Sequence, residues 1–477
     1  MKVRPISKIL VPLFLGLALA DTGVVAESQA PKAAAETALD RYVHAPDPSF
    51  SWKVEGSLSK EGVTQYVLNM VSQNWRTPEE VDRTEWRHWV TVTVPDEVKY
   101  DTALLFIGGG NNGNEAPDEI NKEFAQMAKL TSSVVVELSM VPNQPLEFAK
   151  DGKKRTEDDL IAYTWDKFLR TGDESWPARL PMTKSAVRAM DAVQAFAATD
   201  EAGKHTINNF VVAGGSKRGW TTWTTAAVDK RVVAIVPFVI DLLNIKESFK
   251  HHWEAYGFWA PAVGDYQNAG LMDWMGTPEY DALLQLVEPY SYIDRYTMPK
   301  FIVNACGDQF FLPDSSQFYW DDLKGEKYLR YVPNAGHGLD GSDALYSLVS
   351  FYHCIISKTP LPQYSWAFEG DSLVVKSATK PKSVRYWSAT NSETRDFRVD
   401  VVGKIWKDKK VKAEADGTYR VKLQTPEKGW TAQMVELTFE GPGGTALKYT
   451  TPVKVLPETM PFTYTPPAVL PKGYLSK

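Results

Sequence analysis

The stretch that decides the fold reads NFVVAGGSKRGW and spans residues 209–220. An apolar, β-branched run leads through two glycines to Ser216 and on into residues that favour a helix. A strand, a tight turn with a serine and a helix make a nucleophile elbow, where small neighbours are needed because a larger side chain would clash with the strand or helix. The common pattern is G-x-S-x-G, but here Arg218 stands at the second glycine position and Gly219 follows it. The stretch is therefore either a nucleophile elbow or an ordinary strand-to-helix turn.

Two later strand ends supply the partners that a serine nucleophile needs. The serine hydroxyl requires a base, and the base requires an acid that orients it. In sheet-based hydrolases the acid and then the histidine follow the serine along the chain, each after a strand. Asp308 follows the apolar run 301–305 and is the expected acid, with Asp314 as the alternative, and His337 lies between glycines after the last apolar strand. We therefore predict a triad of Ser216, Asp308 and His337.

The backbone near the elbow is expected to hold the oxyanion of the reaction. Glycines 108–110 follow an early apolar strand, where their N–H groups can face the elbow. The residue after the nucleophile and an early loop supply the two donors in such folds. We predict that the N–H groups of Gly109 and Lys217 form this oxyanion hole, although a plain glycine turn is the alternative for the first.

Strands and helices alternate between residues 103 and 356, as is typical of a mainly parallel sheet with helices on both faces. Residues 50–95 precede them with the alternation of antiparallel strands. Residues 241–296 interrupt the pattern and are rich in aromatic side chains. This insertion is either a cap over a pocket or a helical subdomain with its own core. As a cap, it would place Trp253 and Trp259 in the substrate pocket.

The two ends of the chain differ from its middle. Residues 1–20 have the basic start, apolar run and small residues of a signal peptide, and residues 21–49 read as a leader. Residues 363–460 contain short strands at regular spacing, which predict an immunoglobulin-like β-sandwich before a tail at 461–477. Between these ends we predict an α/β-hydrolase-like domain at 50–358, with a doubly wound, mainly parallel sheet.

Charge and composition exclude several classes of function. The chain has 53 Lys and Arg against 59 Asp and Glu, a net charge of −6. Removal of the signal peptide takes away Lys2, Arg4 and Lys8 and makes it more negative, which leaves no electrostatic basis for binding nucleic acid. We expect an exported protein, periplasmic or secreted, without an integral membrane segment after cleavage. Cys306 and Cys354 either pair or remain separate thiols, and no spacing indicates a metal or a cofactor.

Three segments resemble the PhoPQ-activated pathogenicity-related protein family: GGSKRGW at 214–220, NACGD at 304–308 and NAGH at 334–337. The displaced glycine of the elbow is part of that family's own pattern. The resemblance runs from about residue 42 to about residue 451 and implies an exported α/β-hydrolase-like protein with a C-terminal immunoglobulin-like domain. It also implies a link to virulence and antimicrobial-peptide resistance, and a relation to the autocrine proliferation repressor, a secreted signal.

These observations together predict an exported serine hydrolase that acts on peptides or small esters. The alternative is a binding or signalling protein that retains the hydrolase fold without turnover. The resemblance supports the fold more firmly than the reaction, and the oligomeric state is left open.

Overall fold

The computed structural model describes residues 36–476, which from Thr37 onward form one compact unit. The predicted signal peptide and most of the predicted leader lie outside the described residues. Within the described part of the chain, no helix has the length and apolar character needed to cross a membrane.

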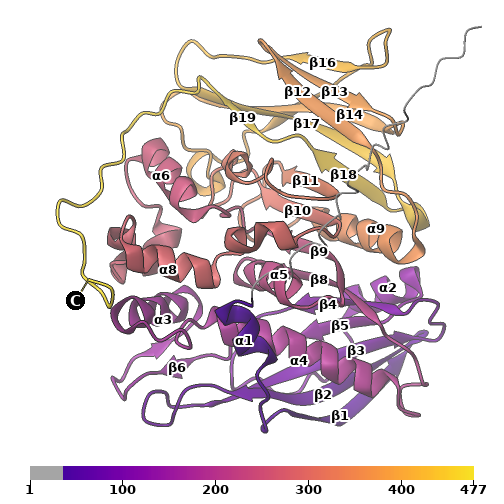
Figure 1. Cartoon of the computed structure of the whole chain (residues 1–477). Helices are drawn as coiled ribbons and strands as arrows, with labels where there is room; N and C mark the ends of the chain where they lie inside the picture. Colours follow the sequence, from indigo (N-terminus) through magenta and orange to yellow (C-terminus); the bar gives the residue numbers. More distant parts are fainter. Residues whose placement is uncertain (1–35, 477) are drawn as a thin grey trace, which may run out of the picture. The chain divides into compact units, whose positions relative to one another are not determined.

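A nine-stranded mixed sheet forms the centre of the fold, in the order β1-β2-β3-β5-β4-β8-β9-β10-β11 (Figure 1). The pairs from β1 to β5 are antiparallel, and every pair from β5 to β11 is parallel. These strands are β1 (Ser51–Lys60), β2 (Val63–Asn74), β3 (Glu85–Pro95), β4 (Thr102–Ile107), β5 (Val135–Leu138), β8 (Asn209–Gly215), β9 (Val232–Phe238), β10 (Lys300–Ala305) and β11 (Lys327–Val332). The predicted α/β fold with a mainly parallel sheet is thereby confirmed, and the antiparallel strands β1 to β3 make the sheet a mixed one.

Alternate side chains of the parallel strands pack into two separate cores, one on each face of the sheet. Phe210 and Val212 of β8 belong to the core that includes α4 and α5, whereas Val211 and Ala213 belong to the core that includes α2 and α9. A strand covered on both faces must be apolar along its whole length, which is why β8 reads as a continuous apolar run. The helices outside the insertion are α1 (Ala38–His44), α2 (Lys122–Thr131), α3 (Glu157–Thr171), α4 (Arg179–Ala197), α5 (Lys217–Val228) and α9 (Ala344–Ser357).

Helix α1 lies in the range that the sequence assigns to a leader. Its Leu39 and Val43 are buried in the same core as α4 and α5, and Asp40 forms an ion pair with Arg295 at 2.8 Å. Ordered structure therefore begins before the first strand. A two-stranded ribbon of β6 (Leu146–Glu147) and β7 (Lys154–Arg155) precedes α3.

The aromatic-rich insertion folds into short helices after β9. They are α6 (Ile245–Tyr256), η1 (Pro261–Val263), α7 (Gly264–Asn268), η2 (Leu271–Trp274), α8 (Pro278–Val287) and η3 (Pro289–Arg295). Apart from a small cluster around Tyr256, its buried side chains, such as Trp274 and Tyr280, belong to the same core as α5. The Trp220 indole of α5 also donates a hydrogen bond to the Val287 carbonyl at 2.7 Å. The insertion is therefore packed onto the hydrolase domain and has no separate core of comparable size.

Beyond α9 the chain forms two antiparallel sheets, β12-β13-β16 and β15-β14-β17-β18, with β19 paired to β17. Their strands, with the short helices α10 and η5 between them, are β12 (Tyr364–Glu369), β13 (Ser372–Ser377), β14 (Ser383–Asn391), α10 (Val399–Val402), β15 (Lys407–Lys410), β16 (Tyr419–Lys422), β17 (Trp430–Glu440), η5 (Pro442–Gly444), β18 (Ala446–Thr450) and β19 (Lys454–Leu456). The short helix η4 (Ser315–Phe318) lies earlier in the chain, between β10 and β11. Tyr449 of β18 stacks on Tyr328 of β11 with ring centroids 4.6 Å apart, which joins this region to the central sheet. Its immunoglobulin-like character stays a prediction.

The segment after β19 returns along the insertion, near α6 and α8 (Figure 1). Gly473 N, Leu475 N and the Ser476 hydroxyl all donate to one oxygen of Glu279 of α8, at 3.2, 3.1 and 2.6 Å. Glu279 is fully buried, so these bonds hold the segment against the insertion.

The two cysteines, Cys306 and Cys354, are both buried and free, so they are separate thiols in this structure.

Candidate active site

Ser216 lies between β8 and α5 in a strained backbone conformation, with φ +54° and ψ −121°. Such a conformation costs a non-glycine residue about 1–3 kcal/mol and persists only where the surroundings enforce it. A Cβ on Gly214 would lie 2.7 Å from the Arg218 carbonyl oxygen, and a Cβ on Gly219 would lie 2.9 Å from the Phe238 carbonyl oxygen. Gly219 therefore allows α5 to approach β9, although it stands one position later than in the common motif. Gly215, by contrast, has open space around it.

The acid and the base follow two neighbouring strands. Ala305 of β10 lies opposite Val332 of β11, so the loops after these strands leave the sheet side by side. They bring the two predicted residues together, since Nδ1 of His337 lies 2.9 Å from both carboxylate oxygens of Asp308. Asp308 is buried and also accepts the Phe310 N–H at 2.8 Å. The carboxylate thus fixes the imidazole with Nε2 pointing away from it.

The second ring nitrogen of His337 has no partner. Nε2 is buried and forms no hydrogen bond within residues 36–476. A buried polar atom without a hydrogen-bond partner lowers the stability of the fold by about 1–3 kcal/mol, so its retention points to a functional role. Phe310 packs on the His337 ring with centroids 4.3 Å apart and also lines the cavity that contains Ser216. The imidazole therefore contacts a ring that lines the same cavity as the serine, but no hydrogen bond joins Nε2 to Ser216 in this structure, and the complete triad stays a prediction.

The predicted oxyanion donors leave the sheet beside the elbow. Ile107 at the end of β4 lies opposite Gly214 of β8, so the turn at glycines 108–110 starts next to Ser216. Lys217 is the first residue of α5, where N–H groups lack acceptors inside the helix. A Cβ on Gly109 would lie 2.7 Å from a guanidinium nitrogen of Arg218, so this turn is in close contact with α5. The role of the two N–H groups in catalysis stays a prediction.

A charged network around the elbow was missed by the sequence analysis. Arg218 donates two hydrogen bonds to Glu157, at 2.9 and 2.7 Å, and a third from Nε to the Val141 carbonyl. Lys217 Nζ lies 2.9 Å from Asp158 and 3.1 Å from Glu157. Burial raises the pKa of Glu157, but the hydrogen bonds and charges of Arg218 and Lys217 outweigh it and lower this pKa to about 2. Glu157 is therefore a carboxylate at neutral pH.

This network connects the elbow to three other elements. The Tyr266 hydroxyl of the insertion donates to Asp158 of α3 at 2.9 Å, and Arg179 of α4 donates to the Lys217 carbonyl at 3.0 Å. A signal was present in the sequence, because two adjacent cations in a turn expected to be buried require carboxylates nearby. The acidic pair at 157–158 opens a helix, but nothing in the sequence shows that it meets the elbow.

Two further buried carboxylates lie near the site. Asp314, the alternative acid, is paired with His251 of α6 at 2.9 Å and with Arg395 at 2.5 Å. Asp241 follows β9 and accepts hydrogen bonds from Tyr319 and Tyr331. Burial raises the pKa of Asp241 to about 7, and the negative charges of other aspartates add to this shift. Asp314 thus joins the insertion to the C-terminal region.

The cavity at Ser216 is small and mostly apolar. Its volume is about 30 Å³, far below the roughly 300–1,000 Å³ that is typical of ligand sites. Phe249, Val263 and Tyr266 of the insertion form part of its wall, while Ser216 itself stays partly exposed. Phe249 contacts Trp259 with ring centroids 5.7 Å apart, and Trp259 contacts Trp253 at 5.1 Å. The two tryptophans stand behind the cavity wall, and their role in substrate binding stays a prediction.

The described residues contain no group of three or more His, Cys, Asp or Glu side chains that could hold a metal ion. The site consists of one serine, one histidine–aspartate pair and a set of ion pairs behind the serine. These are the groups that nucleophilic catalysis with general acid–base assistance requires.

A family model and a curated relative both match most of this chain. The family model described as PhoPQ-activated pathogenicity-related protein matches residues 39–398. The autocrine proliferation repressor protein A of Dictyostelium discoideum is 39% identical over 456 residues, covering 89% of this chain and 92% of the relative.

Solved structures that resemble the chain include acetyl xylan esterase 1 from Thermoanaerobacterium sp. JW/SL YS485, with 14% identity and a TM-score of 0.47 over 67% of this chain and 92% of that one. The acylaminoacyl peptidase of Pyrococcus horikoshii has 13% identity and a TM-score of 0.39 over 66% of this chain and 51% of that one. At such low identities and TM-scores, these similarities carry no information about substrate.

Proposed function

We propose a hydrolytic function for this chain, which belongs to the PhoPQ-activated pathogenicity-related protein family. Ser216 attacks the carbonyl carbon of an ester or a peptide, while His337 takes the serine proton at Nε2 and later delivers it to the leaving group. Asp308 orients the ring and stabilises its protonated form. Water then attacks the acyl-enzyme, again with His337 as the base. The observation that supports this most is the 2.9 Å contact of Asp308 and His337, with an unpartnered Nε2 beside the ring that borders the serine's cavity.

We further propose that the N–H groups of Gly109 and Lys217 hold the oxyanion. The removal of one such donor typically costs about 3 kcal/mol of transition-state stabilisation. The ion pairs of Lys217 and Arg218 with Glu157 and Asp158 hold the first turn of α5 in place, and with it the Lys217 N–H.

The size of the cavity bears on the substrate. A volume of about 30 Å³ favours a short acyl group on the serine and an ester of a small acid as the substrate. A peptide substrate requires Phe249 and its neighbours in the insertion to move outward. We also propose export to the periplasm or the medium, on the predicted signal peptide, and an immunoglobulin-like packing of the two C-terminal sheets. A role in virulence and antimicrobial-peptide resistance rests on the family alone.

A second candidate is a signalling function without turnover. The relative from Dictyostelium discoideum is named as a repressor of proliferation, and a cavity of about 30 Å³ leaves little room for a substrate. The charged and strained elbow favours catalysis, because a strained serine is costly to keep where it serves no reaction.

Labelling with a fluorophosphonate probe distinguishes the two candidates. The purified protein is compared with Ser216→Ala, His337→Ala and Ser57→Ala, where Ser57 is an exposed serine on β1 and serves as the control. We expect the protein and the control to be labelled, and the other two variants to lose roughly four to six decades of rate. If the folded protein does not react with the probe, the hydrolytic proposal is wrong and the signalling function is favoured. Hydrolysis of nitrophenyl esters with acyl chains of increasing length then measures the size limit of the cavity.

A further inference from the structure

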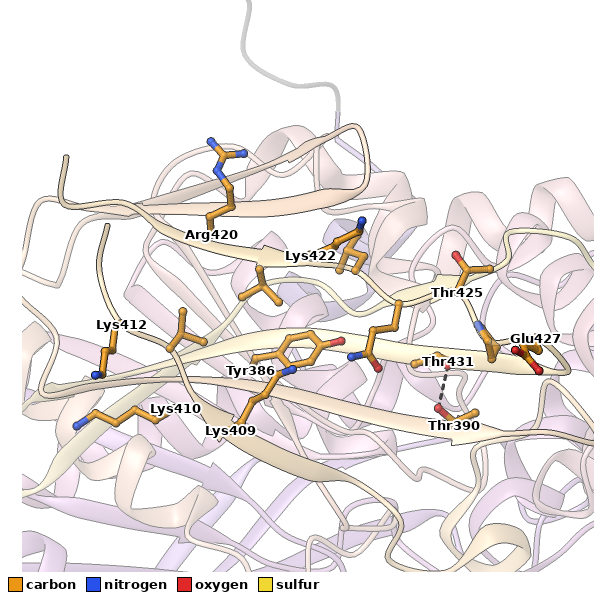
Figure 2. Close-up of a pocket in the computed structure, with 15 residues that line it drawn as sticks. Tyr386, Thr390, Lys409, Lys410, Lys412, Arg420, Lys422, Thr425, Glu427 and Thr431 are labelled. Carbon is orange, nitrogen blue, oxygen red and sulfur yellow. Dashed lines mark hydrogen bonds between the residues drawn. The ribbon is translucent and has the colours of Figure 1, made fainter. Parts of the chain in front are cut away.

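The C-terminal region contains a groove that the hydrolytic site does not use. It lies between the sheet that ends in β15 and the sheet that ends in β16, and its volume is about 870 Å³. That volume falls within the range of roughly 300–1,000 Å³ typical of ligand sites. Figure 2 shows Lys409, Lys410 and Lys412 along one wall and Arg420 and Lys422 along the other.

The groove is basic on a chain that is acidic. Five cations line it against one carboxylate, Glu427, although the net charge of the chain is −6. The cations of β16 are balanced by carboxylates of their own sheet. Among the ion pairs of the described residues, none includes Lys409, Lys410 or Lys412, and Lys409 lies over the Tyr386 ring at 5.0 Å. Three lysines on one wall therefore lack an acidic partner, and an anionic ligand would supply it.

The two walls end in unpaired strands. In the part of the chain that the structure describes, β15 pairs only with β14 and β16 pairs only with β13, so each is the edge of its sheet. Between these edges the groove is lined by the apolar side chains of Val411, Val421 and Leu423. A free strand edge beside apolar side chains can pair with an added strand, as in β-augmentation.

We propose that this groove binds an extended acidic peptide, which adds to the free edge of β16. In a strand, successive side chains point to opposite sides, so one set of the peptide's side chains packs on the partly exposed Val411 and on the edge of the core at Val421 and Leu423, which are largely buried. The other set presents carboxylates to the lysines of β15 and Lys412. Lysine on a sheet edge ordinarily prevents unwanted pairing between edges. Here the same lysines select a strand that carries the opposite charge, and they repel a cationic one.

The test uses the full chain and a short fluorescein-labelled peptide of alternating glutamate and valine. A peptide with lysine in place of glutamate and a labelled polygalacturonate are the comparison probes. Two triple variants with the same change of charge are prepared: K409E/K410E/K412E in the groove and K53E/K60E/K204E on the hydrolase domain. We expect the acidic peptide to bind, the groove variant to lose roughly tenfold or more in affinity, and the second variant to bind as the parent does. Binding should weaken as salt is added.

Amide hydrogen exchange gives the second readout. Strand addition should slow exchange at residues 419–422 when the acidic peptide is bound, because edge N–H groups become hydrogen-bonded. Unchanged exchange there would overturn strand addition, and equal losses in both triple variants would overturn the groove as the site. Binding of polygalacturonate without binding of the peptide would also overturn the proposal and assign the groove to acidic polysaccharides. The Ser216→Ala variant should bind the peptide normally, so this result is independent of the hydrolytic function.

Discussion

The replacement of Gly214 by alanine tests whether close packing holds Ser216 in its strained conformation. The new Cβ would lie 2.7 Å from the Arg218 carbonyl oxygen and 2.9 Å from its carbon. Both atoms are backbone, so the first turn of α5 must move, and Lys217 with the predicted oxyanion donor moves with it. Gly215→Ala is the matched control, since a Cβ there meets nothing within 4 Å and its φ is not positive.

The expected magnitude follows from the displacement. Restoring an ordinary contact of 3.4 Å from 2.7 Å requires a movement of about 0.7 Å. A misplacement of about 1 Å near the reacting atoms can cost about 100-fold in rate, so we expect Gly214→Ala to slow the reaction by roughly 10- to 100-fold. Overpacking of this kind also lowers the free energy of unfolding by about 1–3 kcal/mol. Gly215→Ala should stay close to the parent in both quantities.

The assay is the rate of fluorophosphonate labelling, measured together with urea unfolding for the parent and both variants. Unfolding shows how much of each variant is native, so the labelling rate can be expressed per folded molecule. If Gly214→Ala were labelled as fast as Gly215→Ala, the packing of the elbow would not be what positions the serine, and the reasoning above would be wrong.

Three further predictions concern the surroundings of the site. Arg218→Lys keeps the charge but loses the paired bonds to Glu157, so labelling should slow by roughly tenfold, and a rate equal to the parent's would remove Arg218 from the positioning of the elbow. Burial raises the pKa of Asp241 to about 7 from an ordinary 3.8, so the folded state holds a proton that the unfolded state releases, and stability falls as pH rises between these values. Urea unfolding at pH 4 and pH 7 should show that the free energy of unfolding of the parent falls by about 4 kcal/mol more than that of Asp241→Asn as the pH rises. A difference between the two proteins that does not change with pH would contradict the raised pKa of Asp241. Deletion of residues 457–476 removes three hydrogen-bond donors from the buried carboxylate of Glu279. Limited proteolysis within residues 245–295 should therefore become faster. An unchanged cleavage rate would mean that the C-terminal segment does not hold the insertion.

The sequence was informative where chemistry depends on order along the chain. The apolar runs located β8, β10 and β11, and because parallel strands end at one edge of a sheet, the residues after them had to converge there. Asp308 and His337 could be paired for this reason. The elbow could be located from its glycines, but only the structure shows that Gly214 and Gly219 are sterically required and that Gly215 is not.

Contacts between distant side chains were beyond sequence reasoning. Arg218 and Glu157 lie on different helices, and their pairing depends on how α3 and α5 pack. The same holds for Asp314, which looked like an alternative acid but is paired with His251 and Arg395. The volume of the cavity depends on the exact packing of the insertion, which no periodicity encodes.

The position of Gly219 bears on how such proteins are found in genomes. A pattern search for G-x-S-x-G rejects this chain, because the pattern allows one residue between the serine and the second glycine, whereas two residues separate Ser216 from Gly219. The steric requirement is different: a residue without a side chain must lie where the first turn of the helix crosses the neighbouring strand's carbonyl at Phe238. A glycine can meet this requirement two or three residues after the serine. Searches that accept either spacing, and then require an acid and a histidine after two later strands, would recover elbows that a fixed pattern overlooks.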